Sequence, residues 1–433
     1  MKKYFLAVAS FFIYSHISLG QVYPGQMDST FVPVRSHHYD PELTFDFCVN
    51  EPAWSNQAGI HSAFGSTDRL YFRKEVPVNH DNDLSSSYST TVWRGERANA
   101  QILVWSSEAL EQVRVSTQDL RSAEGNIIPK DRITFELVRY VLSNYPYAEK
   151  KAICGESPYK SGFLMPDRFE TLDRFDLPSQ TTRPVWMMVD VPRGTAPGTY
   201  KGQVEVRAKG KAPQLLNLEI VVQNQLLPYP KDWKYRLDLW QNPWAVAWYN
   251  HVEPWSPEHK MLLKQHLKHY ADAGGTYITT YGVHSPWSDN SYMIEGGMIE
   301  WIKKADGTWA FDYKIFDEYV ELAMECGIDE AITLYTPIPW GFRHRYKDEA
   351  TGDYSYINWA PSSKEFKKMW NIFLTDFKFH LEAKSWLDIT YIGINENPME
   401  ETLAAINVVR NHDKCWKITY AGNWHKELDG LLD

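Results

Sequence analysis

The chain has 433 residues, a formal net charge of −10 and an aromatic content of 15%, with 18 Trp and 26 Tyr. The length is enough for two ordinary domains, and the negative charge argues against nucleic acid or an acidic polymer as partner, because either requires a basic face. Exposed aromatic rings stack on the apolar faces of sugars, so the composition favours a carbohydrate ligand, although large domains also bury many aromatic side chains. Four scattered cysteines predict neither a disulfide framework nor a zinc site: Cys48, Cys154, Cys326 and Cys415.

The first residues are typical of a secretory signal peptide. Lys2 and Lys3 precede an apolar stretch from Leu6 to Ile17, and Ser18-Leu19-Gly20 provides small residues for cleavage. The apolar stretch is shorter than the roughly 20 residues that a membrane-spanning helix needs, and no later segment is long enough either. We therefore expect residues 1–20 to be a signal peptide and the protein to be exported, as a periplasmic, cell-surface or secreted protein.

Residues 21–225 alternate short strand-like segments with turn signals and show almost no helical periodicity. The segments TTVWRGERANAQILVWSS (Thr91 to Ser107) and RPVWMMVDVPRGTAPGTYKGQVEVRAKG (Arg183 to Gly210) are interrupted by Pro-Arg-Gly and Pro-Gly turns. This pattern predicts an antiparallel β-sandwich domain that supports the following domain. A sugar-binding role is also open, but nothing in the predicted strands singles out a site.

Residues 226–433 alternate predicted strands with amphipathic helices. One helix is expected to begin at Ser256-Pro257-Glu258, and another at a capping pair formed by Ser362 and Glu365. Alternation of this kind predicts parallel strands with helical crossovers, as in a (β/α)8 barrel. A closed barrel needs about eight strands, so we expect one that is truncated after about five strands: 235–240, 276–282, 330–336, 388–394 and 417–424.

The stretch YIGINENPMEE (Tyr391 to Glu401) holds three glutamates after a predicted strand. Asn397 and Pro398 suit the cap and first position of a helix, which places Glu400 at the third position and Glu401 in the first turn. A helix N-terminus favours negative charge, so both of these glutamates have a structural explanation.

Glu396 has no such explanation, because it precedes the cap and lies at the end of the apolar strand, where barrel enzymes carry catalytic groups. A general acid must keep its proton at working pH, which partial burial among aromatic side chains would favour. We predict Glu396 to be the proton donor, with a solvated loop glutamate as the alternative. The neighbouring amide of Asn395 either binds a substrate hydroxyl or acetamido group or satisfies its own turn backbone.

Four segments together resemble glycoside hydrolase family 123: WQNPWAVAWYNHVEPWSPEH (Trp240 to His259), YTPIPWGF (Tyr335 to Phe342), YIGINENPMEE, and TYAGNWH (Thr419 to His425). No single segment is specific, but their ordered set is, and the similarity runs from the predicted sandwich through the fifth barrel strand. The resemblance implies an exo-acting β-N-acetylgalactosaminidase with a β-sandwich followed by a (β/α)8 barrel.

The resemblance also implies a retaining, substrate-assisted mechanism, in which the sugar's 2-acetamido oxygen attacks C1 and an adjacent Asp-Glu pair assists. The family's Glu falls on Glu396, whereas its Asp falls on Asn395. An amide lacks the charge that would stabilise the oxazolinium intermediate, which could cost about 2–4 kcal/mol of transition-state stabilisation. Three explanations stay open: a natural Asn-Glu pair, an engineered knock-out, or an impaired member of the family.

Two other functions compete with this one. A retaining barrel glycosidase with two glutamates would also use Glu396 as acid/base, but its nucleophile would lie on a seventh strand outside this sequence. A sugar-binding homologue without turnover is the other alternative. All three hypotheses imply a glycan partner, and the family 123 hypothesis implies one with a terminal N-acetylhexosamine. The substrate-assisted and two-carboxylate glycosidase mechanisms require no metal or other cofactor. Candidate substrate-binding residues at predicted strand ends are Trp240, His284, Tyr335, Trp340, Asn423 and Trp424.

Overall fold

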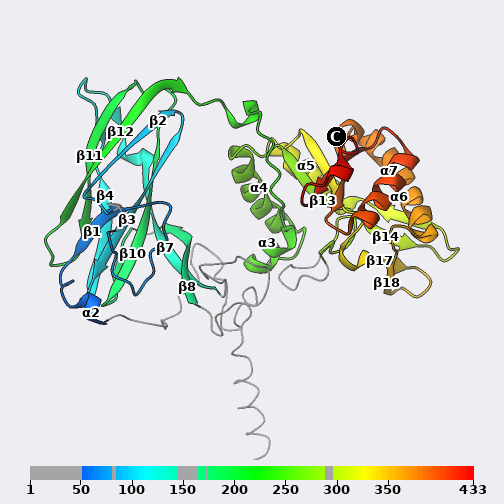
Figure 1. Ribbon diagram of the computed structural model, residues 1–433, viewed down its shortest axis with the longest axis horizontal. Coiled ribbons are helices and arrows are strands. Elements are labelled where there is room, and N and C mark those ends of the chain that lie inside the picture. The colour runs from blue at the N-terminus through cyan, green and yellow to red at the C-terminus, as the bar shows by residue number, and fades with distance from the viewer. Residues whose placement is uncertain (1–50, 80–83, 144–162, 172, 288–295) are drawn as a thin grey trace, which may run out of the picture. The chain divides into compact units, whose positions relative to one another are not determined.

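The structure is a computed structural model that describes residues 51–79, 84–143, 163–171, 173–287 and 296–433. The expected signal peptide at residues 1–20, as well as Cys48 and Cys154, lies outside the described residues. The chain folds into two compact units, and the boundary between them lies between Leu227 and Pro228 (Figure 1). In the part of the chain that is described, no helix has the length and apolarity needed to cross a membrane.

The first unit consists of two sheets that follow the short helix α2 (Glu51–Trp54). One sheet has the order β1 (His61–Gly65), β3 (Arg97–Ser106), β10 (Thr181–Asp190), β7 (Ile133–Ser143) and β8 (Phe163–Thr171), with all neighbours antiparallel. The other has the order β2 (Ser87–Arg94), β12 (Gln214–Leu226), β11 (Gly198–Arg207), β4 (Leu110–Thr117) and β9 (Phe175–Leu177). In this sheet β2 and β12 are parallel, so the predicted antiparallel arrangement is wrong for this one pair. The short β5 (Leu120–Arg121) pairs with β11 and with β6 (Ile127–Ile128), and the 3-10 helix η2 (Lys130–Arg132) leads into β7.

Alternating side chains from both sheets fill one hydrophobic core. On β10, Val185, Met187 and Val189 are buried in it, and β12 contributes Leu218 and Ile220 in the same way. Because successive residues of a strand point to opposite faces, the apolar alternation of the sequence produces an inner face in each sheet. The predicted segment Thr91 to Ser107 is in fact two strands, β2 and β3, separated by a turn at Gly95 with φ of +84°.

The second unit contains a four-stranded parallel sheet in the order β13 (Tyr277–Tyr281), β16 (Ala331–Tyr335), β19 (Thr390–Asn395) and β20 (Lys417–Ala421). Helices alternate with these strands: α4 (Pro257–Asp272), α5 (Lys314–Glu325), α6 (Lys364–Lys384) and α7 (Met399–His412). The shorter helices are η3 (Pro230–Asp232), α3 (Pro243–Asn250), η4 (Trp340–Phe342), η5 (Leu387–Ile389) and η6 (Lys426–Leu428). A second sheet, which the sequence did not predict, is inserted between these elements in the order β15 (Trp309–Asp312), β14 (Glu300–Lys303), β17 (Arg343–Asp348) and β18 (Tyr354–Asn358).

Two details of the sequence prediction need correction. The predicted strand 235–240 pairs only through one bridge between Leu237 and Gly275, so the described residues form an open four-stranded sheet rather than a barrel of five strands. The predicted cap at Ser362 lies one residue too early, because the Ser363 side chain accepts the hydrogen bond from the Phe366 N–H at 3.1 Å. The predicted cap at Ser256 is confirmed, with its side chain accepting from the His259 N–H.

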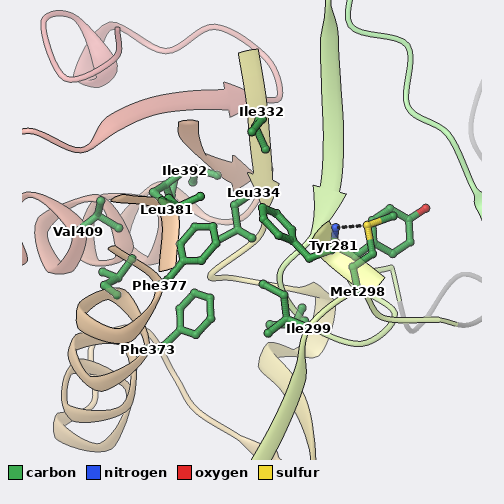
Figure 2. Packing of buried hydrophobic residues seen from close by; sticks show 14 of the residues in the cluster. Tyr281, Met298, Ile299, Ile332, Leu334, Phe373, Phe377, Leu381, Ile392 and Val409 are labelled. Carbon is green, nitrogen blue, oxygen red and sulfur yellow. Dashed lines mark hydrogen bonds between the residues drawn. The ribbon is translucent and has the colours of Figure 1, made fainter. Parts of the chain in front are cut away.

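One face of the parallel sheet packs against the helices through an aromatic core (Figure 2). Leu334 of β16 and Ile392 of β19 meet Phe373 and Phe377 of α6 there, and each is fully buried. Burying a side chain of this size stabilises the fold by about 1.5–3 kcal/mol. Since side chains alternate along a strand, Tyr335 and Asn395 lie on the opposite face of the sheet.

Candidate active site

The carboxyl ends of the four parallel strands meet at one edge of the sheet, where open α/β sheets bind their ligands. Trp287 follows β13, Thr336 follows β16, Glu396 follows β19 and Asn423 follows β20. Each strand therefore delivers a polar or aromatic side chain to the same edge.

Asn395 is the last residue of β19 and only 3% exposed. The Tyr335 hydroxyl donates to its Oδ1 at 2.5 Å, and its backbone N–H donates to Thr336 Oγ1 at 3.1 Å. Its Nδ2 donates to the Ile338 carbonyl at 3.4 Å. The amide is therefore held by the segment that follows β16 and not by its own turn. Burial is the main cause that raises the pKa of Tyr335, and the negative charge of Glu396 raises it further, so the phenol stays a neutral donor.

Glu396 is exposed, in contrast to the partial burial that we expected. Its Oε1 accepts a hydrogen bond of 2.8 Å from Asn423 Nδ2 and a longer one of 3.4 Å from the Asn423 backbone N–H. This contact joins the ends of β19 and β20 and fixes one oxygen of the carboxylate. Its other oxygen, Oε2, has no hydrogen-bond partner among the described residues.

Three aromatic rings meet at Tyr335, the residue that donates to Asn395. Trp287 stacks on Tyr335 with ring centroids 5.0 Å apart, and Trp240 contacts Tyr335 at 4.7 Å and Trp287 at 5.3 Å. Trp240 keeps 42% of its surface exposed. Trp287 is not among the predicted binding residues, although it lies only five residues after the end of the predicted strand 276–282, and this proximity could have indicated it. Tyr281 contacts Trp287 edge-on at 5.0 Å.

The remaining predicted binding residues are less closely joined to this group. His284 is half-buried, and burial together with the positive charges of Arg345 and Arg343 lowers its pKa to about 4. Trp340 is 42% exposed at the start of η4, and its backbone N–H donates to the Pro286 carbonyl. Trp424 is 74% exposed. Within the described residues, neither His284 nor Trp424 makes a hydrogen bond with Asn395 or Glu396.

The predicted helix cap at Asn397 is wrong, because α7 begins at Met399 and its cap position is Pro398. Asn397 instead donates through Nδ2 to the Ile338 carbonyl at 3.1 Å, so it ties the turn after β19 to the segment after β16. Glu400 and Glu401 do lie in the first turn of the helix, each one position earlier than predicted.

No group of three or more His, Cys, Asp or Glu side chains in the described ranges is placed to hold a metal ion. Cys326 and Cys415 are free thiols. The groups described at the sheet edge include the Glu396 carboxylate, the amides of Asn395 and Asn423, the Tyr335 phenol and indole rings, which can transfer a proton and bind hydroxyl or acetamido groups.

Comparisons with known proteins point to one family. The family model described as the glycoside hydrolase 123 catalytic domain matches residues 240–433, and that described as the glycoside hydrolase 123 N-terminal domain matches residues 64–208. A solved family 123 glycoside hydrolase from Clostridium perfringens, studied for glycolipid glycan hydrolysis, has 26% sequence identity and a TM-score of 0.76. The match covers 87% of this chain and 66% of that one, so this chain spans just under two thirds of its length.

Other solved glycoside hydrolases are too dissimilar to support an argument. A family 39 enzyme from Bacteroides cellulosilyticus WH2 has 12% identity and a TM-score of 0.24 over 72% of this chain and 50% of its own. A family 5 xyloglucanase from Bacteroides ovatus has 11% identity and a TM-score of 0.21 over 77% and 63%. No curated protein matches the sequence.

Proposed function

The chain belongs to glycoside hydrolase family 123, and we propose that it is an exo-acting enzyme that releases terminal β-linked N-acetylgalactosamine. The observation that carries this proposal is the Asn395-Glu396 pair at the carboxyl end of β19, with each side chain held from a neighbouring strand end. The natural substrate is a glycan with a terminal N-acetylhexosamine. The related Clostridium perfringens enzyme was studied on glycolipid glycans, which makes these a first class to test.

In the proposed first step, the carbonyl oxygen of the sugar's 2-acetamido group attacks C1. The bond from C1 to the leaving oxygen breaks, and that oxygen takes a proton from Glu396. In the second step, the Glu396 carboxylate removes a proton from a water molecule that attacks C1 and opens the oxazolinium ring. Two inversions at C1 give overall retention, and the enzyme supplies no nucleophile of its own.

Asn395 would orient the acetamido group. A side-chain carbonyl oxygen has two acceptor positions, of which Tyr335 occupies one. The second can accept the acetamido N–H and so direct the acetamido oxygen toward C1. Because Tyr335 and Thr336 hold Asn395 before substrate binds, this alignment requires little reorganisation.

The aromatic rings of Trp240 and Trp287 would form an apolar wall for the acetamido methyl and the sugar ring. Trp240 is suited to this contact because its ring is anchored on Tyr335 on one side while a large part of it remains exposed. The exposed Trp424, next to Asn423, would contact a more distant part of the glycan.

The test compares the unaltered chain with Glu396→Gln on phenyl β-N-acetylgalactosaminide, a substrate whose leaving group needs a proton. Loss of the general acid should lower kcat about 10²- to 10⁴-fold. Glu400→Gln is the matched control, because Glu400 lies in the first turn of α7 on the same segment, and its kcat should change less than about twofold. If all three proteins are inactive but still bind N-acetylgalactosamine, the hydrolase proposal fails and a sugar-binding homologue is the better account.

A further inference from the structure

The outer face of the five-stranded sheet carries an aromatic pair that belongs to neither hydrophobic core. Trp186 lies on β10 and Phe169 on β8, with β7 between these two strands. Their rings meet above β7, with centroids 5.6 Å apart and planes tilted by 33°. Trp186 lies directly across from Glu136, and Phe169 lies across from Val138, so all four side chains share the outer face.

The indole of Trp186 is fixed in place by a hydrogen bond. Its Nε1 donates to Asn99 Oδ1 on β3 at 3.1 Å, which leaves the Asn99 amide nitrogen able to donate to a ligand. On the other side, Glu136 Oε1 accepts from the Thr171 hydroxyl at 3.0 Å, which leaves Oε2 able to accept. A pair of rings is thus flanked by a fixed donor and a fixed acceptor.

The two rings could simply shield Val138 from solvent, but this role alone does not explain how they are arranged. Val138 is 4% exposed, whereas Phe169 keeps 48% of its surface exposed to solvent. A pair of rings that served only as a cover would be expected to bury both of its members more completely. Exposed aromatic surface next to convergent polar groups is instead typical of a binding site.

We infer that Trp186, Phe169, Asn99 and Glu136 form a second, non-catalytic site that binds neutral glycans. The ring faces would stack on the C–H faces of pyranose units, while the amide and the carboxylate would bind their hydroxyl groups. The charges of this face favour a neutral ligand: Glu136 would repel an acidic sugar, and Arg97, the nearest exposed cation on β3, is paired bidentately with Asp190. The inference does not depend on the chemistry at Glu396.

The test measures retardation of the full chain in native gels that contain desialylated mucin, which presents neutral glycans. We compare the unaltered protein with Trp186→Ala and with Trp93→Ala, since Trp93 is a 40% exposed tryptophan on β2 of the other sheet. Trp186→Ala should raise the dissociation constant at least about tenfold, whereas Trp93→Ala should leave it unchanged. The catalytic site is present in all three proteins, so any retardation that it causes is the same background in each.

Asn99→Ala serves as a second variant, because it removes the polar contact but leaves both rings, and it should weaken retention by a smaller factor. Thermal unfolding is measured for every variant to show that it is folded. Hydrolysis of phenyl β-N-acetylgalactosaminide is also measured, so that failure of the proposed catalytic function can be distinguished from failure of the proposed second site. The inference is overturned if the unaltered protein is not retarded. It is also overturned if folded Trp186→Ala and Asn99→Ala proteins are retarded as strongly as the unaltered one.

Discussion

The two units build their hydrophobic cores from different kinds of side chain. The core of the first unit is almost entirely aliphatic, with Phe64 and Tyr200 as its only fully buried aromatic members among the described residues. The core of the second unit is built from stacked and edge-on aromatic rings, among them Trp301, Trp370 and Phe373.

This difference shows that much of the high aromatic content is buried in the core of the second unit. β-Branched and other aliphatic side chains fill the space between the two face-to-face sheets, whereas large aromatic rings fill much of the space between the parallel sheet and its helices. Many of the tryptophans that suggest a sugar-binding protein by composition are buried and therefore structural. Trp240 combines exposure with ring contacts that fix its position, and Trp186 is half-buried with its indole held by a hydrogen bond.

The largest expected effect tests this contrast between the cores. Phe373 stacks on both Trp301 and Phe377, so Phe373→Ala should lower the free energy of unfolding by about 3–5 kcal/mol. Ile220→Val in the aliphatic core should cost only about 0.5–1.5 kcal/mol. Urea unfolding of each variant measures both values, and a loss for Phe373→Ala as small as that for Ile220→Val would contradict a structural role for the stacked rings.

The next prediction concerns the side of the parallel sheet that faces away from the aromatic core. Asn395→Asp restores a negative charge beside the developing oxazolinium and should raise kcat on phenyl β-N-acetylgalactosaminide about 10²-fold. The Tyr335 hydroxyl can donate to the new carboxylate as it does to the amide. Steady-state kinetics at several pH values checks this prediction, and an unchanged or lower kcat would show that the site is adapted to an amide.

A smaller effect is expected when the support of Asn395 is removed. Tyr335→Phe keeps the ring that Trp287 stacks on but deletes the donor to Asn395 Oδ1. Leaving that buried acceptor with one partner fewer should cost about 1–3 kcal/mol and lower kcat by about tenfold or more. If kcat stays the same while the free energy of unfolding falls, Tyr335 acts on stability alone.

The smallest expected effect is a loss of stability at acidic pH that arises from two histidines of the second unit. Burial lowers the pKa of His284 and of His344 to about 4, and both lie in the second unit. Below the unfolded pKa of about 6.5, the unfolded chain binds protons that the folded unit does not. Each of these histidines should therefore reduce the free energy of unfolding by about 1 kcal/mol between pH 6.5 and 5.5.

Urea unfolding at both pH values measures this loss, with His344→Gln as the comparison. The variant should lose less stability on acidification than the unaltered chain. An identical pH dependence in the two proteins would exclude His344 as a source of acid sensitivity.

Sequence reasoning located the edge of the parallel sheet because each strand there ends at a recognisable change from apolar to polar residues. It placed Glu396 directly after β19 for this reason, and it identified the helix start at Ser256 from the residue's capping chemistry. Both signals are local, so they can be read from a few consecutive residues.

Features that depend on contacts between distant segments could not be read in this way. Asn397 fits a helix cap by its local sequence, but the helix begins two residues later, and the Asn397 Nδ2 donates to the Ile338 carbonyl, 59 residues away. Trp186 and Phe169 meet across a third strand, and neither has a sequence neighbour that reveals the other. The partial burial predicted for Glu396 also depended on surroundings that its own segment does not specify.

The most direct test of the proposed mechanism compares two substrates that differ only at C2. The unaltered chain is assayed on phenyl β-N-acetylgalactosaminide and on phenyl β-galactoside, which lacks the acetamido oxygen needed to attack C1. We predict hydrolysis of the first, with loss of activity in Glu396→Gln, and no measurable hydrolysis of the second. Comparable rates on both substrates would contradict substrate assistance and would require a nucleophile from the protein.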